Sequence, residues 1–294
     1  MLQSVSGAGV HAAQLAHDAP VRQLSLQFQH DRLHTLRQDP PWKVVRGFRN
    51  PGGAILVHLN NVSGGVLAGD RLELDIEVDD GVSALVTTTG ATRLYRHRPG
   101  SADSEQKATF TVGERATLEY LPDPLIPYAG SRYAQHTKFS LEPHATLFWW
   151  EVLAPGRQAA GEAFRFDKLC IHSEISVEGA PVLKESFSLE PLQRPLAITA
   201  RMREYSHLAS FYVCQSGRPP RFWRDLEDEL NALAREFTRP GEALWGSSTL
   251  ASDGLIVRGL TTSQRFIPNA LIGFWRAAKK AVKGEDAVLP RKVY

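Results

Sequence analysis

The histidines are the residues most able to bind a metal ion, because imidazole is the commonest metal-binding side chain in proteins. The chain has ten of them, and His30 and His34 have the four-residue spacing that would place both rings on one face of a helix. The preceding residues 24–28 alternate between apolar and polar types, as a strand does, so that helical geometry is not expected. There is no His-Glu-x-x-His motif and no Cys/His set with zinc-site spacing. The sequence therefore predicts no built-in catalytic metal.

Motifs for nucleophilic catalysis and phosphate binding are also absent. The chain contains no Gly-x-Ser-x-Gly elbow and no Gly-Lys-Ser or Gly-Lys-Thr phosphate loop. A glycine-rich stretch at residues 63–70 leads into a strand, so it lacks the helix N-terminus that would hold a pyrophosphate. If GTP drives the function of this protein, the sequence predicts that a partner binds it.

Carboxylates are the remaining chemical option. Asp70, Glu119, Glu151 and Glu162 lie in or beside the most unusual segments of the chain. Glu119 and Glu151, on neighbouring predicted strands, could act as acid and base in a carbohydrate-active enzyme, and this alternative function stays open at this point. The other interpretation is that these acids cap turns or form ion pairs with Arg93, Arg132 and Arg157.

The elements that position these residues are mostly strands between residues 24 and 189. Residues 72–78 place an apolar side chain at every second position, which predicts a strand with one buried face. The same alternation recurs at residues 108–112, 117–121, 146–150 and 171–177.

Three segments have the same local pattern, in which a turn is followed by a small residue and then by a strand. The small residues are Ala84, Ala116 and Ala145. These alanines are 32 and 29 residues apart. A repeat of this size suggests sheets stacked in layers, as in a β-solenoid.

The C-terminal third is different. Apolar residues from Phe222 to Phe237 follow the spacing of one helix face, and Pro268 and Gly284 mark the start and end of a second helix. No linker separates two domains. We therefore predict a flexible segment at residues 1–20 and, at residues 21–294, a mainly β single domain of the β-solenoid or stacked-sheet type with two C-terminal helices.

Composition narrows the possible functions. The 294 residues carry a net charge of +2 at pH 7, which argues against a nucleic-acid partner. No stretch approaches the about 18 consecutive apolar residues of a membrane span, and the first 20 residues lack the pattern of a secretory signal. With only Cys170 and Cys214, neither in a metal or redox motif, we expect a cytoplasmic protein without a membrane partner.

Four segments together resemble the urease accessory family called UreD, or UreH in some organisms. They are HLNNVSGGVLAGD at residues 58–70, TTTGATRLYR at 87–96, LEYLPDPLIPY at 118–128, and Glu151 followed by GRQAAGEAF at 156–164. Their order and spacing make the resemblance specific, and it extends from about Leu24 to the end of the chain.

This resemblance implies a non-enzymatic role in urease maturation. Family members form a complex with UreF and the GTPase UreG, which docks on apo-urease while nickel is inserted. For this chain it implies a dimer of such heteromeric complexes, no tightly bound cofactor, and nickel as a transient ligand. The positions that match proposed nickel-path residues of the family are His58, Asp70, Thr88, Thr92, Glu151 and Glu162. Partner contacts are expected near the C-terminal helices and tail, at Phe222, Trp223, Trp275 and Arg291.

The sequence departs from the family pattern in two segments that are expected to lie at the surface. Residues 40–42 read Pro-Pro-Trp where the family has a Gly-Pro-Leu-like entry, and the chain closes on Arg291-Lys292-Val293-Tyr294 without a tryptophan. Both are expected to alter contacts with partners more than the fold.

Overall fold

The structure is a computed structural model that describes residues 20–30, 32–199 and 201–289. The predicted flexible segment at residues 1–20 lies, apart from Pro20, outside the described residues, and so does Arg291.

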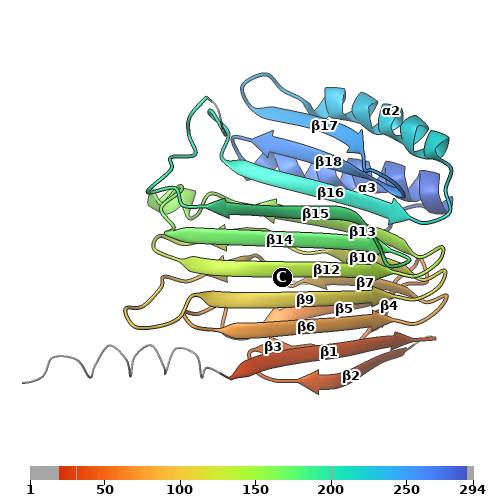
Figure 1. The fold of residues 1–294 in the computed structure, drawn as a ribbon, viewed down its shortest axis with the longest axis horizontal. Helices are drawn as coiled ribbons and strands as arrows, with labels where there is room; N and C mark the ends of the chain where they lie inside the picture. The colour runs from red at the N-terminus through yellow and green to blue at the C-terminus, as the bar shows by residue number, and fades with distance from the viewer. Residues whose placement is uncertain (1–19, 31, 200, 290–294) are drawn as a thin grey trace, which may run out of the picture.

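Two sheets face each other in the described part of the chain (Figure 1). The first sheet has seven strands, in the order β15 (Ala180–Leu189), β14 (Lys168–Val177), β12 (Arg132–Leu141), β9 (Ser104–Val112), β6 (Arg71–Val78), β1 (Val21–Gln29) and β2 (Arg32–Gln38). The main path of the second sheet runs β17 (Ala243–Thr249), β18 (Gly254–Thr261), β16 (His207–Gln215), β13 (Thr146–Leu153), β10 (Thr117–Leu121), β7 (Ser83–Thr88), β5 (Ile55–Asn61) and β3 (Trp42–Lys43). Three short strands join this second sheet beside that path: β4 (Phe48–Arg49), β8 (Thr92–Leu94) and β11 (Leu125–Pro127).

The predicted strands are confirmed, and their alternation explains the layers. On β6, Leu72, Leu74, Ile76 and Val78 are buried while the residues between them are more exposed. These side chains point toward the second sheet and join the larger of the two main hydrophobic clusters. The core of the β part therefore lies between the two sheets.

Between β5 and β14 the long strands alternate between the sheets, and successive strands within each sheet pair in parallel. The three alanine-centred segments lie on neighbouring strands β7, β10 and β13. Leu118 pairs with Ala84 and with Leu147, so the repeat holds between Ala116 and Ala145 but is shifted by two residues at Ala84. A shift of two keeps the same face buried.

The predicted β-solenoid is not confirmed. In the part of the chain that the structure describes, the two sheets are not closed into a coil, and each ends in edge strands: β2 and β15 in the first sheet, β3 and β17 in the second. Antiparallel pairs such as β14–β15 and β16–β18 end the parallel stacks. The fold is mainly β, with a single domain and two C-terminal helices.

The two predicted helices are confirmed as α2 (Pro220–Phe237) and α3 (Ile267–Lys283), and 3-10 turns form at η1 (Gln158–Ala160) and η2 (Gln264–Phe266). Pro268 lies in the first turn of α3, and Gly284 caps its end with a φ of 70°. Both helices cover the outer face of the second sheet, where their apolar residues build a second hydrophobic cluster (Figure 1). Among the described residues no helix combines the length and apolar composition of a membrane span.

One buried ion pair lies inside this helix layer. Glu119 of β10 is 1% exposed, and its carboxylate accepts hydrogen bonds from Lys279 Nζ and Trp275 Nε1, each at 2.7 Å. Lys279 is itself buried on α3. Burial raises the pKa of Glu119, and the ammonium group and the indole N–H oppose that effect. The pair fixes α3 to the centre of the second sheet.

Candidate functional site

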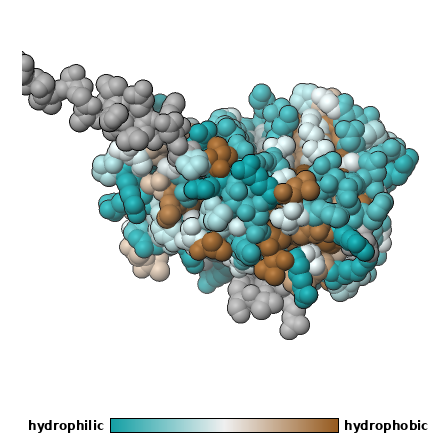
Figure 2. Space-filling model, turned by 90° about the horizontal axis from the view of Figure 1, so that it is seen from below, coloured by the Kyte–Doolittle hydropathy of each residue, from teal (hydrophilic) through white to brown (hydrophobic). Residues whose placement is uncertain are grey.

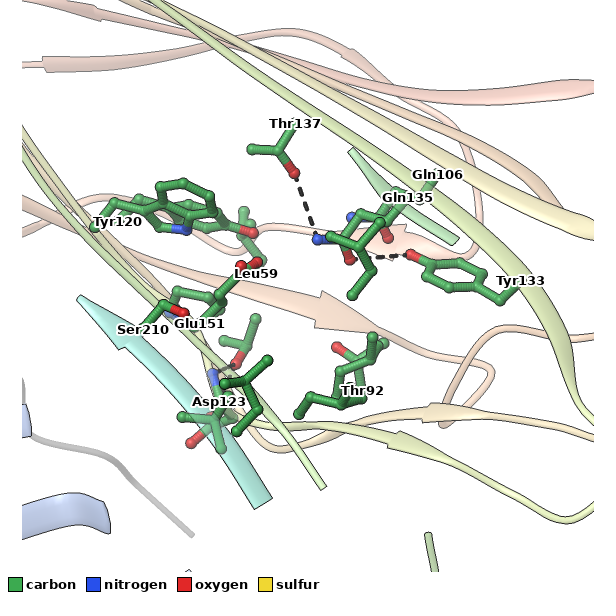
Figure 3. Close-up of a pocket in the computed structure, with 18 of the residues that line it drawn as sticks. Leu59, Thr92, Gln106, Tyr120, Asp123, Tyr133, Gln135, Thr137, Glu151 and Ser210 are labelled. Carbon is green, nitrogen blue, oxygen red and sulfur yellow. Dashed lines mark hydrogen bonds between the residues drawn. The ribbon is translucent and has the colours of Figure 1, made fainter. Parts of the chain in front are cut away.

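A cavity of about 70 Å³ lies between the two sheets, which is enough to hold water. It lies where β7, β10 and β13 of the second sheet approach their C-terminal ends and where β9 and β12 of the first sheet begin. Figure 3 shows its polar side chains converging from both sheets. The cavity lies within the larger hydrophobic cluster between the sheets.

Inward positions on these strands carry polar residues where apolar ones would complete the core. The polar lining consists of Thr88, Thr92, Gln106, Tyr120, Asp123, Tyr133, Gln135, Thr137, Glu151 and Ser210. The Tyr133 hydroxyl donates to Gln135 Oε1 and Gln135 Nε2 donates to Thr137 Oγ1, both at 3.4 Å (Figure 3). Burial raises the pKa of both Tyr120 and Tyr133, so these phenols remain protonated. The cavity is lined by neutral oxygen and nitrogen groups together with carboxylates.

Glu151 is the inward-facing carboxylate of β13. Burial raises its pKa to about 7, the Glu185 carboxylate adds to this effect, and the Arg258 guanidinium opposes it. Its protonation therefore changes near neutral pH. When ionised it can ligate a cation, and when protonated it can donate a hydrogen bond.

Three residues behind Glu151 connect the sheets. Glu185 of β15 accepts a hydrogen bond from the Tyr212 hydroxyl at 2.8 Å and forms an ion pair with Arg258. Tyr212 and Arg258 belong to β16 and β18 of the second sheet, while Glu185 belongs to the first. This group joins the sheet edge at β15 to the second sheet and places two charges near Glu151.

Thr88 and Asp123 form the opposite wall. The Thr88 hydroxyl donates to Asp123 Oδ2 at 2.9 Å and accepts from the Asp123 backbone N–H at 2.8 Å. Asp123 and Pro122 also line a separate hollow beside the N-terminal part of α3. This wall therefore separates the interior cavity from the outside of the second sheet.

Three of the six predicted site residues meet in the cavity, namely Thr88, Thr92 and Glu151. His58 lies on the outer face of β5, in a surface groove with its ring edge-on to Phe48. His58 does not line the interior cavity, because strand alternation turns its side chain outward, and its place on a metal path stays a prediction.

Asp70 and Glu162 lie in loops and do not line the cavity, so their place on a metal path stays a prediction. Asp70 accepts the Leu67 backbone N–H at 2.8 Å and caps a turn, while burial raises its pKa. Glu162 pairs with Arg157 and accepts the Ala129 N–H at 3.3 Å. The hydrogen bond from Arg157 lowers the pKa of Glu162. Both acids take the turn-capping and ion-pairing roles that were the alternative.

The proposed catalytic pair does not form. Glu119 points toward the helices, whereas Glu151 points between the sheets, so the two carboxylates lie on opposite faces of the second sheet. Acid and base must flank one substrate bond, and these two cannot.

Comparison with known proteins decides the family. The sequence model described as UreD urease accessory protein matches residues 21–294. The chain belongs to the UreD family. It is 41% identical over 270 residues, 92% of this chain and 94% of the relative, to a urease accessory protein UreD of Herpetosiphon aurantiacus. A UreD of Staphylococcus epidermidis is 28% identical over 73% of the chain and 75% of its own length.

A UreD of Staphylococcus aureus (strain JH9) is 33% identical over 171 residues, which is 58% of this chain and 61% of the relative. Membership in the UreD family gives the chain a role in urease maturation and a place with urease and its accessory proteins.

The segments that carry the UreD resemblance meet at one end of the molecule. Backbone hydrogen bonds join Val66 to Arg93, Thr92 to Pro124, and Ala154 to Leu125, at 2.8–2.9 Å. Each segment begins within a strand of the second sheet, namely β5, β7, β10 or β13, and runs into the loop that follows it. Because these strands stack in parallel, all four segments contribute lining residues to the cavity. The segments that carry the UreD resemblance thus lie beside the interior cavity.

Trp223 and Trp275, expected at a partner interface, are buried in the second hydrophobic cluster. A buried side chain offers no surface to a partner, so these tryptophans support the helix layer from beneath. Phe222 is half-buried, with the Arg218 guanidinium 4.8 Å from its ring centroid. Of the predicted partner-binding residues that the structure describes, it is the one with surface available to a partner.

Sequence reasoning missed Gln106, Gln135, Tyr133 and Ser210. Polar residues at inward positions of alternating strands are the signal that could have identified them, since each replaces an expected apolar residue. Among the described residues no group of three or more His, Cys, Asp or Glu side chains is arranged to hold a metal ion.

Proposed function

We propose that this chain assists nickel insertion into urease by letting the ion pass through its interior cavity. The observation that carries the proposal is the polar cavity between the sheets, where Thr88, Thr92 and Glu151 meet. Such a site presents scattered oxygen ligands, which hold a divalent ion weakly and release it, and lacks the closed ligand set of a storage site. Nickel is thus a transient cargo, and no tightly bound cofactor is required.

The proposal includes a complex with UreF and the GTPase UreG that docks on apo-urease, with two such complexes forming a dimer. No phosphate loop occurs in this sequence, which supports a division of labour in which UreG supplies GTP hydrolysis. The helix layer formed by α2 and α3 is the proposed docking surface for UreF, with Phe222 exposed in part. The chain acts by binding and guiding rather than by catalysis.

A cytoplasmic location is part of the same proposal. Cys170 and Cys214 are free thiols, and Cys214 is buried. Free thiols are usual in reducing compartments.

Filling the cavity tests the proposal. Ser210 is buried and lies directly across from Glu151 in the β13–β16 pair, so Ser210→Leu places a bulky apolar group in the cavity. Overpacking of this kind costs about 1–3 kcal/mol, which a folded domain can tolerate. We expect urease co-expressed with Ser210→Leu and all other accessory proteins to contain several-fold less nickel.

Ser186→Leu is the matched control, because Ser186 is exposed on the outer face of β15. It should leave the nickel content of urease unchanged. Normal nickel content with a folded, complex-forming Ser210→Leu chain would refute passage through the cavity.

A further inference from the structure

A surface groove of about 540 Å³ lies at the outer face of β4 and β5. Val45, Phe48, Leu56 and His58 supply its apolar and aromatic lining. Val45 is 75% exposed and Phe48 39% exposed, although both are hydrophobic. Seen from the end of the molecule formed by β1 and β2, hydrophobic residues gather in patches among hydrophilic ones (Figure 2). A groove of this kind favours an apolar occupant.

The path of the chain leads directly into this groove. After α3 ends at Gly284, Lys280 Nζ lies 3.1 Å from Asp286 Oδ1, and Asn50 Nδ2 donates to the Val288 carbonyl at 3.5 Å. Val288 and Leu289 then form one wall of the groove. The described chain therefore ends at the groove, and Pro290–Tyr294 follow from that point.

The next five residues fit the groove in reach and chemistry. An extended chain covers up to about 3.3–3.6 Å per residue, so Pro290–Tyr294 can span about 17 Å from Leu289. Val293 and Tyr294 supply one aliphatic and one aromatic side chain. The groove already holds an edge-to-face contact between Phe48 and His58, with ring centroids 6.3 Å apart, and the Arg46 guanidinium lies 4.7 Å from the Phe48 centroid. Another aromatic ring can stack in such surroundings.

We propose that the segment Pro290–Tyr294 docks in the β4–β5 groove of its own chain, with Tyr294 against Phe48 and Arg46. Docking covers the exposed apolar lining and fixes the chain after α3 across the outer face of the second sheet. Leu289 also borders the hollow beside α3 that Pro122 and Asp123 line. The docked segment thereby covers the outer side of the Thr88–Asp123 wall. The inference does not depend on the nickel proposal.

Hydrogen exchange of the β4 region tests this proposal directly. We expect a chain that ends at Leu289 to exchange the amides of residues 45–50 about tenfold faster than the full chain, because β4 loses its outer cover. Tyr294→Ala should reproduce most of this acceleration. Adding the free peptide Pro-Arg-Lys-Val-Tyr at millimolar concentration should restore protection to the shortened chain.

Leu244→Ala is the matched control, because Leu244 is 49% exposed on β17 at the far edge of the same sheet, and it should leave β4 exchange unchanged. Unchanged exchange in the shortened chain would overturn the proposal. Protection that rises with protein concentration in the full chain would also overturn it, since the occupant would then be a second copy.

Discussion

Lys279→Ala is expected to lower the free energy of unfolding by about 3–5 kcal/mol, because it leaves the buried Glu119 carboxylate without its cation. Glu119 is 1% exposed and Lys279 4% exposed, so water cannot replace the lost partner. Trp275 Nε1 would still donate to Glu119, but one neutral N–H cannot balance a buried charge. Urea unfolding followed by tryptophan fluorescence measures the change.

Lys280→Ala provides the control at the next position of the same helix. Lys280 pairs with Asp286 at the surface, where its side chain is 63% exposed, and its loss should change stability by no more than about 0.5 kcal/mol. The double variant Glu119→Gln/Lys279→Met should recover most of the lost stability, because it removes both charges. If Lys279→Ala were as stable as Lys280→Ala, the buried pair would not be what fixes α3.

Glu151→Gln is expected to stabilise the chain at pH 8 by about 3 kcal/mol while impairing nickel delivery to urease. The pKa of Glu151 is about 7 in the fold, against 4.5 for an ordinary glutamate. Between these values the folded chain binds more protons than the unfolded chain, so stability falls as pH rises from about 4.5 to 7. That loss persists above pH 7, and glutamine removes it because it does not ionise.

Urea unfolding at pH 4.5 and pH 8 tests whether Glu151 lowers the stability of the fold as the pH rises. The gain from Glu151→Gln should be present at pH 8 and absent at pH 4.5, whereas Glu77→Gln, on an exposed outward position of β6, should show neither effect. An equal gain at both pH values would mean that the Glu151 carboxyl is not shifted by burial. In cells, urease matured with Glu151→Gln should contain less nickel than urease matured with Glu77→Gln.

The sequence predicted the local elements well, since period-two alternation and helix caps are local signals. The strand at residues 72–78 and the helix that begins at Pro268 and ends at Gly284 both appear as expected. Whether the two sheets close into a solenoid could not be predicted from such local signals. A stack of strands becomes a solenoid or stays as two separate sheets according to which strand edges pair. The sequence of a single strand does not specify its partner at the edge.

The site was predicted in part for a similar reason. Thr88, Thr92 and Glu151 face the cavity because their strands stack in register, whereas His58 differs by one position of alternation and faces outward. Asp70 and Glu162 lie in loops, where no periodicity fixes side-chain direction. Glu185 belongs to the antiparallel strand β15, far along the sequence from Glu151, and only the tertiary fold places it near that carboxylate.

The most direct test of a role in nickel delivery is the nickel content of urease matured with and without this chain. Urease structural and accessory genes would be co-expressed in both conditions, and the purified enzyme analysed for metal and activity. The account predicts that urease formed without the chain is assembled but nickel-poor and inactive. Fully nickel-loaded, active urease in the absence of the chain would contradict it.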